Sequence, residues 1–401
     1  MNKRILFVDD ESLVLRGLER SLRSMRAEWD IEFADSGPAA LATMERHPFD
    51  VVITDMRMPG MNGAQLLDQV KRMFPQTVRM ILSGQSDKET ILRSIGPTHQ
   101  YLAKPCDVED LKQKLTHAFA LRDLLSDPRL KEVVSQLHVV PSLPQLYLAI
   151  TDLVRSPEAS ITEAGNIIAQ DMGMCVKVLQ LVNSAFFGLA TPVSNPRQAA
   201  ALIGIDNIKA LVLSVHVFSQ FEGLSADLSF LWKHSLSAAG CAKAIARQQD
   251  AKRALVDDCF TAGLLHDIGK LILVSVYPEE STRIWQDCAQ NGDSVLTNEQ
   301  QALGCTHAAV GAYLLGLWGL PDPIVEAVAW HHRPADAPTP KFGPLIATHV
   351  ANYFDHQMNS YPVASKPALD ENLLANLGLG KYVEAWGHIC RELHSQSEKH
   401  E

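Results

Sequence analysis

The segment FDVVITDMRMPGMNG, residues 49–63, contains a short apolar run that ends at an acidic residue and continues into a turn. Residues 51–54 are apolar or β-branched, Asp55 follows them, and Pro59, Gly60 and Gly63 come after it. A short apolar run bounded by turn residues predicts a strand that is buried in a parallel sheet. Because ligands bind beyond the carboxyl ends of such strands, Asp55 is a candidate functional residue.

The same pattern recurs on both sides of this segment. Amphipathic stretches such as residues 11–25, in which Leu15, Leu18 and Leu22 recur at helical spacing, separate further apolar runs. These runs are RILFVDD (4–10), IEFAD (31–35), VRMILSG (78–84) and HQYLAKP (99–105). Strands that alternate with helices predict an α/β fold with a parallel sheet. We therefore expect an α/β domain with five parallel strands over residues 1–120.

Five polar residues stand at or just past the ends of the predicted strands: Asp9, Asp10, Asp55, Ser83 and Lys104. Parallel strands place their carboxyl ends at one edge of the sheet, so these side chains should lie together. Three neighbouring carboxylates repel one another unless a cation joins them, and their hard oxygen atoms suit Mg²⁺. Lys104 would supply a fixed positive charge, and Ser83 a hydroxyl for an anionic oxygen. The set predicts transfer of a phosphoryl group to Asp55.

The DD pair, DMRMPGMNG, SG and KP occur in an order and spacing that closely resemble the receiver domain of two-component response regulators. This resemblance covers residues 1–120 and implies a doubly wound, flavodoxin-like fold. It implies the following roles: Asp55 as the phospho-acceptor, Asp9 and Asp10 as Mg²⁺ ligands with Asp55 and the carbonyl of Arg57, Ser83 and Lys104 as phosphoryl contacts, and Tyr101 as the aromatic switch residue. The expected partner is a sensor histidine kinase or a phosphotransfer protein of a phosphorelay.

The pattern changes after the receiver-like segment. Asp107 is a candidate N-cap and Asp127-Pro128 a stop signal, which predicts one helix between them. Leu111, Leu115 and Ala118 form its apolar stripe. We interpret residues 121–132 as a helical linker, and a role in signalling or as a dimer seam stays open. From residue 131 amphipathic helices predominate, so the predicted divisions are an all-α output domain over 133–338 and a C-terminal helical extension and tail over 339–401.

Histidines and an aspartate recur on the predicted helices of this second region. They are His234, the His266-Asp267 pair with Lys270 one turn later, His307, and the His331-His332 pair. One histidine within an apolar helix is usually a core residue. Five of them with a carboxylate exceed what packing alone requires, and facing helices of bundles hold metals with such side chains. A pair of divalent transition metals there could activate water for hydrolysis of a phosphoester.

This region resembles the HD superfamily of metal-dependent phosphohydrolases and, more closely, the HDOD domain, an HD-related output module of bacterial signalling proteins. The resemblance covers residues 133–335 and rests on PSLPQL, LVNSAFFG, AALIG, HDIGK and THAAVGAYLLGLWGLPDPIVEAVAWHH. Compared with the HD-GYP cyclic-di-GMP phosphodiesterases, all six candidate ligands and Lys270 find matching positions. HDOD domains as a family are regarded as non-catalytic modules that act through protein contacts.

Three departures from the HD-GYP pattern argue against a complete two-metal centre. No GYP motif follows His331-His332, and Phe230 stands where some of those enzymes carry a ligand glutamate. Asn352 falls on the position of the closing aspartate, and Asp355, one turn later, is a possible substitute. The ligands of one metal could survive. If instead the His266-Asp267 pair is a structural remnant, Asp267 must accept hydrogen bonds from its neighbours inside the bundle.

Two functional hypotheses follow. In the first, phosphorylation of Asp55 controls an HDOD output domain that acts mainly through protein–protein interaction. In the alternative, it gates a metal-dependent phosphodiesterase that acts on a cyclic dinucleotide or a related phosphoester. The net charge of −10 over 401 residues argues against a nucleic-acid partner. The seven scattered cysteines, the absence of a leader, and no apolar stretch that we judge long enough to span a bilayer predict a cytoplasmic protein without a membrane partner. A homodimer is possible.

Overall fold

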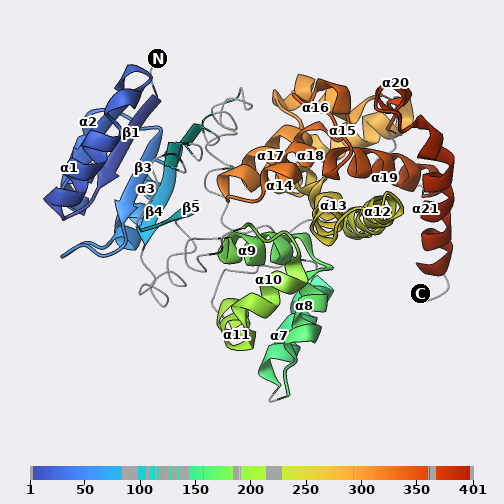
Figure 1. Ribbon diagram of the computed structural model, residues 1–401, viewed down its shortest axis with the longest axis horizontal. Coiled ribbons are helices and arrows are strands. Elements are labelled where there is room, and N and C mark those ends of the chain that lie inside the picture. The colour runs from blue at the N-terminus through green and yellow to red at the C-terminus, as the bar shows by residue number, and fades with distance from the viewer. Residues whose placement is uncertain are drawn as a thin grey trace. The chain divides into compact units, whose positions relative to one another are not determined.

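The computed structural model describes most of the chain, as Figure 1 shows from blue at the N-terminus to red at the C-terminus. The described residues are 3–83, 98–104, 109, 111–112, 115–116, 119, 127, 134, 142, 144–156, 158–183, 189, 191–213, 228–291, 293–359, 361 and 367–397. They form two compact units. One comprises Met1–His138, Gln180–Pro192 and Gly316–Gly319, and the other comprises Val139–Leu179, Val193–Leu315 and Leu320–Glu401.

The first unit contains a five-stranded parallel sheet with the order β2-β1-β3-β4-β5. The strands are β1 (Lys3–Val8), β2 (Trp29–Ala34), β3 (Val51–Asp55), β4 (Val78–Ser83) and β5 (Gln100–Ala103). The described helices that alternate with them are α1 (Ser12–Ser21), the 3-10 helix η1 (Arg23–Ala27), α2 (Gly37–Arg46) and α3 (Gly63–Met73). This arrangement confirms the predicted doubly wound α/β fold.

The register of the strands brings their carboxyl ends to one edge. Val8 pairs with Thr54, Asp55 pairs with Leu82, and Ser83 pairs with Ala103. Every residue of β3 is buried, which agrees with the continuous apolar run that predicted a strand covered on both faces. The residues that end β1, β3, β4 and β5 are therefore neighbours, as expected from the sequence.

The turn after β3 is held close to the strand by Gly63, the first residue of α3. A Cβ atom at Gly63 would lie 2.1 Å from the backbone oxygen of Asp55, so only glycine permits this approach. Asn62 caps the helix by accepting from the backbone N–H of Gln65, and the Gln65 side chain accepts from the backbone N–H of Asn62. The PGMNG stretch thus serves both the turn and the helix start.

The predicted helix after β5 is described only in part. Leu111 and Leu115 are helical and fully buried, as the predicted apolar stripe requires. Within the predicted linker, residues 121–132, only Asp127 lies among the described residues.

The second unit is helical in its described residues, which confirms the predicted all-α region. Its elements are α7 (Pro144–Arg155), α8 (Ile161–Ile168), α9 (Met172–Val182), α10 (Pro196–Ile203), α11 (Ile205–Leu213), α12 (Ser229–Gln248), α13 (Arg253–Leu265), α14 (Ile268–Val276), α15 (Pro278–Asn291), α16 (Val295–Leu303), α17 (His307–Leu317), α18 (Asp322–Trp330), η2 (Pro334–Asp336), α19 (Pro344–Met358), α20 (Glu371–Asn376), η3 (Gly380–Tyr382) and α21 (Val383–Ser397). The last residues of two of them, α9 and α17, fall in the short segments that are grouped with the first unit.

Small residues let the central helices of this unit approach closely. A Cβ atom at Gly263 of α13 would lie 2.8 Å from the Cα atom of Ala239 on α12. A Cβ atom at Gly269 of α14 would lie 1.9 Å from the backbone oxygen of His307 on α17. Glycine at these two positions therefore brings α12 and α17 against the residues that join α13 to α14, which are His266 and Asp267.

The continuous stretch through α13 and α14, Arg253–Val276, is long and apolar enough to cross a bilayer by length and composition alone. The expectation that no stretch reaches that length was too strict. Within the fold, however, 83% of its apolar window is buried, which is typical of a core helix.

Candidate functional site

The predicted receiver residues meet at the carboxyl edge of the sheet. Asp9 follows β1, Asp55 ends β3, and Lys104 follows β5. Lys104 Nζ lies 2.7 Å from Asp55 Oδ1 and 2.9 Å from Asp9 Oδ2. Asp10 is exposed, and one ligand oxygen from each of the three aspartates lies within 4.8 Å of the others. The edge therefore combines three carboxylates with one ammonium group.

Backbone amides hold the remaining carboxylate oxygens. The N–H of Arg57 donates to Asp55 Oδ2 at 3.1 Å, and the N–H of Glu11 donates to Asp9 Oδ1 at 2.9 Å. Burial lowers the pKa of Lys104, but its hydrogen bonds to Asp55 and Asp9 outweigh burial and raise the pKa above its ordinary value. Lys104 therefore remains a fixed cation beside Asp55.

Two predicted receiver residues are located only by their backbone positions. Ser83 is the last residue of β4, and Tyr101 lies on β5 opposite Ile81. Their side chains lie outside the described residues, so their proposed contacts stay predictions.

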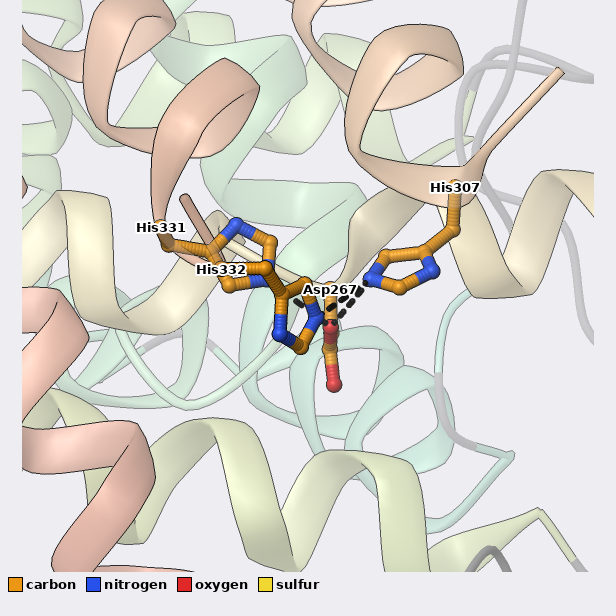
Figure 2. A group of neighbouring side chains, drawn as sticks. All are labelled: Asp267, His307, His331 and His332. Atoms are coloured by element: carbon orange, nitrogen blue, oxygen red, sulfur yellow. Dashed lines mark hydrogen bonds and ion pairs between the residues drawn. The ribbon is translucent and has the colours of Figure 1, made fainter. Parts of the chain in front are cut away.

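A second group of candidate residues comes together inside the helical unit. His234 lies on α12, the pair His266-Asp267 lies between α13 and α14, and His307 begins α17. His331 and His332 directly follow α18. Figure 2 shows the rings of His307, His331 and His332 around the Asp267 carboxylate. All of the predicted ligands are therefore neighbours, although they come from four separate parts of the chain.

The Asp267 carboxylate lies at the centre of this group and is 1% exposed. Lys270 Nζ donates to Asp267 Oδ2 at 2.6 Å. Around Asp267 Oδ1, His307 Nε2 lies at 3.3 Å and His331 Nε2 at 3.7 Å. Among the described residues, neither Asp267 Oδ1 nor His331 Nε2 has a hydrogen-bond partner. Unpaired polar atoms inside a protein are costly, so these two atoms are candidate ligands for a cation.

The outer nitrogen of each central histidine is held by an acceptor. His266 Nδ1 donates to the carbonyl of Gly263 at 2.8 Å, and His331 Nδ1 donates to that of Val328 at 2.9 Å. His234 Nδ1 lies 2.6 Å from Asp355 Oδ2. His307 Nδ1 lies 2.7 Å from Glu299 Oε2. Such partners place a proton on Nδ1 and direct the Nε2 atom inward, as around protein-bound metals.

Two pairs of Nε2 atoms consequently face each other. His234 Nε2 lies 3.0 Å from His266 Nε2, and His307 Nε2 lies 3.1 Å from His332 Nε2. Two lone pairs at this distance repel unless a proton or a metal ion lies between them. Each pair therefore needs a proton or a metal ion between its two nitrogen atoms.

The pKa values of the five histidines shift in different directions. Burial lowers the pKa of His234, but its hydrogen bonds to Asp267 and Asp355 outweigh burial and raise it. Burial also lowers the pKa of His307, and there Glu299 and Asp267 raise it above its usual range. Burial lowers the pKa of His266 to about 4 and holds those of His331 and His332 well below their ordinary value. The latter three histidines remain neutral and available as ligands at neutral pH.

Asp267 remains ionised within this group. Burial raises the pKa of its carboxyl, but the charges of neighbouring His266 and Lys270 and the close contacts with His234 and His307 hold the pKa well below its usual range. Because Lys270 already neutralises Oδ2, the anionic site with free lone pairs is on the side of Oδ1.

Asp355 is a partner of His234 and has no oxygen left for a metal. Its Oδ2 receives Tyr361 Oη at 2.8 Å in addition to His234, and its Oδ1 accepts from Ser237 and Asn359. The idea that Asp355 replaces the missing closing aspartate is therefore not supported by the geometry. Asn352 is 1% exposed on α19, and its Oδ1 has no hydrogen-bond partner in the described part of the chain.

Glu299 is the functional residue that the sequence reasoning missed. It lies on α16, is 2% exposed, and accepts from both the backbone N–H and Nδ1 of His307. Its burial is not visible in the sequence, where Glu299 is an ordinary glutamate eight residues before His307. Phe230, which occupies the position of a ligand glutamate in some HD-GYP enzymes, contacts the rings of Trp285 and Tyr361 instead.

The donor set fits one divalent metal better than two. Asp267, His307, His331 and His332 offer ligand atoms within 4.8 Å of one another, and so do His234, His266 and Asp267. In the second group Lys270 already occupies Asp267 Oδ2, and only two imidazoles remain as ligands. Three imidazoles and one carboxylate suit a transition metal such as Zn²⁺, Mn²⁺ or Fe²⁺.

Comparison with known families finds two matches along the chain. The model of the response regulator receiver domain matches residues 5–116, and that of the HDOD domain matches residues 140–334. The chemotaxis protein CheY-3 of Vibrio cholerae is 31% identical over 121 residues, which are 29% of this chain and 92% of that protein.

Two further matches extend over more than half of this chain. An uncharacterised protein of Treponema pallidum is 28% identical over 222 residues, which are 54% of this chain but only 42% of that protein. The chain therefore covers less than half of that relative. Among solved structures, the MmoQ response regulator of Methylococcus capsulatus is 23% identical with a TM-score of 0.45, over 62% of this chain and 97% of that one.

Proposed function

Because this chain belongs to the response regulators, with a receiver domain followed by an HDOD domain, we propose that phosphorylation of Asp55 controls the HDOD output domain. The observation that carries the proposal is the ion pair between Asp55 and Lys104 at the carboxyl edge of the sheet. The Asp55 carboxylate is the nucleophile toward a phosphoryl donor, and Lys104 offsets the negative charge that the phosphoryl group adds. A sensor histidine kinase or a phosphotransfer protein is the natural donor.

The three aspartates fit Mg²⁺. Asp9, Asp10 and Asp55 offer hard oxygen atoms within reach of one another, and a single ammonium group does not balance their charge. Bound there, Mg²⁺ would supply further positive charge beside the transferred group. Asp55 also receives the backbone N–H of Arg57, which orients its carboxylate.

The test of this proposal is labelling with a small phosphodonor in the presence of Mg²⁺. Wild type should take up one acid-labile phosphoryl group per chain, whereas Asp55→Asn should take up none and keep its fold. Asp68→Asn is a matched control, because Asp68 lies on α3 in a surface pair with Arg72. If Asp55→Asn is labelled as well as Asp68→Asn, Asp55 is not the acceptor.

We propose that the HDOD domain passes the signal on mainly through protein contacts and that it also holds one metal ion. The departures at Phe230 and Asn352 and the lack of a GYP motif favour protein contacts as its main output. The unpartnered atoms Asp267 Oδ1 and His331 Nε2 favour the metal. The ligands would be Asp267, His307, His331 and His332.

A second candidate function is a phosphodiesterase that is gated by the receiver. The metal would supply Lewis acidity toward a phosphoester. Lys270 is 5% exposed and would remain as a buried cation beside Asp267. Metal analysis of the purified protein, paired with hydrolysis assays on cyclic dinucleotides in Mn²⁺ or Fe²⁺, separates the two functions. Stoichiometric metal without turnover supports a binding module, and turnover that is lost in Asp267→Ala supports the enzyme.

A further inference from the structure

The helical unit contains a pocket that shares no lining residue with the histidine group. The pocket has a volume of 720 Å³ and lies where the first turn of α10 meets α12 and the beginning of α13. Its lining residues are Asn195, Arg197, Gln198, Lys243, Arg247, Ala251, Arg253, Val256 and Asp257. This volume lies in the range of small-molecule sites.

The pocket is strongly cationic in a protein that is acidic. Four cationic side chains, Arg197, Lys243, Arg247 and Arg253, stand against the single carboxylate of Asp257. The whole chain has a net charge of −10, so an excess of three positive charges in one pocket is a local reversal. Such a concentration of like charge in a hollow raises the local concentration of anions.

Of these four cations, only Arg253 forms an ion pair with a carboxylate among the described residues. Asp257 lies 3.9 Å from Arg253 Nε, and Arg253 is almost fully exposed. Arg197 Nε donates to the neutral side chain of Asn166 at 2.7 Å, and Lys243 Nζ lies 5.4 Å from the centre of the Phe260 ring. These neighbours orient the two side chains without neutralising them.

The pKa of the half-buried Lys243 reflects both its burial and the positive charges near it. Burial lowers its pKa, and the nearby charges of Arg247 and Arg197 lower it further, against the opposing effect of Asp257. A lysine in this position is stabilised in its charged form when an anion binds beside it. The N-terminal amides of α10 do not serve this purpose, because Asn195 already accepts from the N–H groups of Arg197 and Gln198.

We propose that this pocket binds a small molecule that carries a diphosphate or triphosphate group. Arginine and lysine are the side chains that pair with phosphoryl oxygens, and an excess of three charges matches a polyanion better than a single carboxylate. Ala251 and Val256 leave part of the wall apolar, which suits a ligand with an organic portion. Nucleotides combine these features, and inorganic pyrophosphate shares the charged part alone.

The test is calorimetric titration of the full chain with ATP, pyrophosphate and sulfate in metal-free buffer, which prevents Mg²⁺-mediated binding at the receiver. ATP or pyrophosphate should bind saturably at one site, and sulfate should bind much more weakly. Lys243→Gln and Arg247→Gln should each weaken binding about tenfold, since each removes one charge-assisted hydrogen bond. Arg283→Gln is the control, because Arg283 is exposed on α15 away from the pocket.

Comparison of the ligands identifies which kind of phosphate compound binds, and three results would overturn the proposal. Tighter binding of ATP than of pyrophosphate assigns a nucleotide, and the reverse assigns an inorganic polyphosphate. If Lys243→Gln lowers the melting temperature, Arg247→Gln is used alone, because Arg247 is exposed. Absence of saturable binding at millimolar ATP and pyrophosphate overturns the proposal. Equal weakening by Arg283→Gln also overturns it, and so does binding of polyglutamate in place of both phosphates.

Discussion

Removal of the metal should destabilise the helical unit, and Asp267→Ala should abolish that response. A ligand that binds only the folded state adds RT ln(1 + [L]/Kd), which is about 4 kcal/mol at a thousandfold excess over Kd. For a unit of this size, each kcal/mol changes the melting temperature by about 2–4 °C. We therefore expect chelation to lower the melting temperature of wild type by roughly 10 °C, with recovery on addition of Mn²⁺ or Fe²⁺.

The Asp267→Ala variant isolates the contribution of the carboxylate. Lys270 Nζ lies 2.6 Å from Asp267 Oδ2 and is itself nearly buried. Without that carboxylate, the ammonium group is a buried charge without its partner, which costs about 3–5 kcal/mol. The variant should therefore melt below chelated wild type, which keeps the pair of Asp267 and Lys270, and should not respond to chelator.

The assay is thermal unfolding of the full chain with and without chelator, together with elemental analysis of the same samples. Asp287→Ala is the control, because Asp287 is exposed on α15 and the variant should keep the wild-type response. A wild type that contains no metal and melts identically with chelator, Mn²⁺ and Fe²⁺ would refute the metal site. Asp267 would then be a structural remnant that is held by Lys270.

Three further outcomes follow from the contacts around the two sites. Glu299→Gln removes the charge behind His307 and should weaken metal binding about 10–100-fold by titration, whereas the exposed Glu280→Gln should have no effect. Lys104→Ala leaves two carboxylates without their cation, so the receiver should lose about 1–3 kcal/mol in a melt without Mg²⁺ and recover with it; an unchanged melt would contradict the ion pairs. Gly269→Ala forces backbone apart, since its Cβ would lie 1.9 Å from the His307 oxygen, and should cost about 1–3 kcal/mol and reduce metal content, while Gly240→Ala, with open space around its Cβ, should be neutral or stabilising.

The receiver was predictable because its pattern is local. Each strand is a short apolar run, and the acid or lysine that follows it is adjacent in sequence. A parallel sheet then needs no further information to bring the strand ends together. The order β2-β1-β3-β4-β5 places Asp9, Asp55 and Lys104 within hydrogen-bonding distance, as the spacing indicated.

Only the candidate ligands at the centre of the helical site could be predicted from the sequence. Their outer hydrogen-bond partners could not. A histidine at the end of an apolar helix can be recognised in the sequence, but the direction of Asp355 cannot. Asp355 lies 121 residues from His234, and the two meet because α12 packs against α19. Whether Asp355 faces the centre or the back of His234 depends on a fraction of a helical turn, which periodicity alone does not determine.

The outer partners of the histidines decide whether the group is a metal site or a remnant, and they fall into two classes. His266 and His331 each donate to the carbonyl three residues earlier, a contact that a histidine at a helix end obtains from its own helix. His234 and His307 instead require buried carboxylates from other helices. A bundle that merely retained inert histidines would lose stability by burying Asp355 and Glu299 and would gain no function from them. Both acids are buried, each is paired with a candidate ligand, and each leaves an Nε2 atom directed at the centre. That arrangement is the one expected when the nitrogen atoms have a cation to hold.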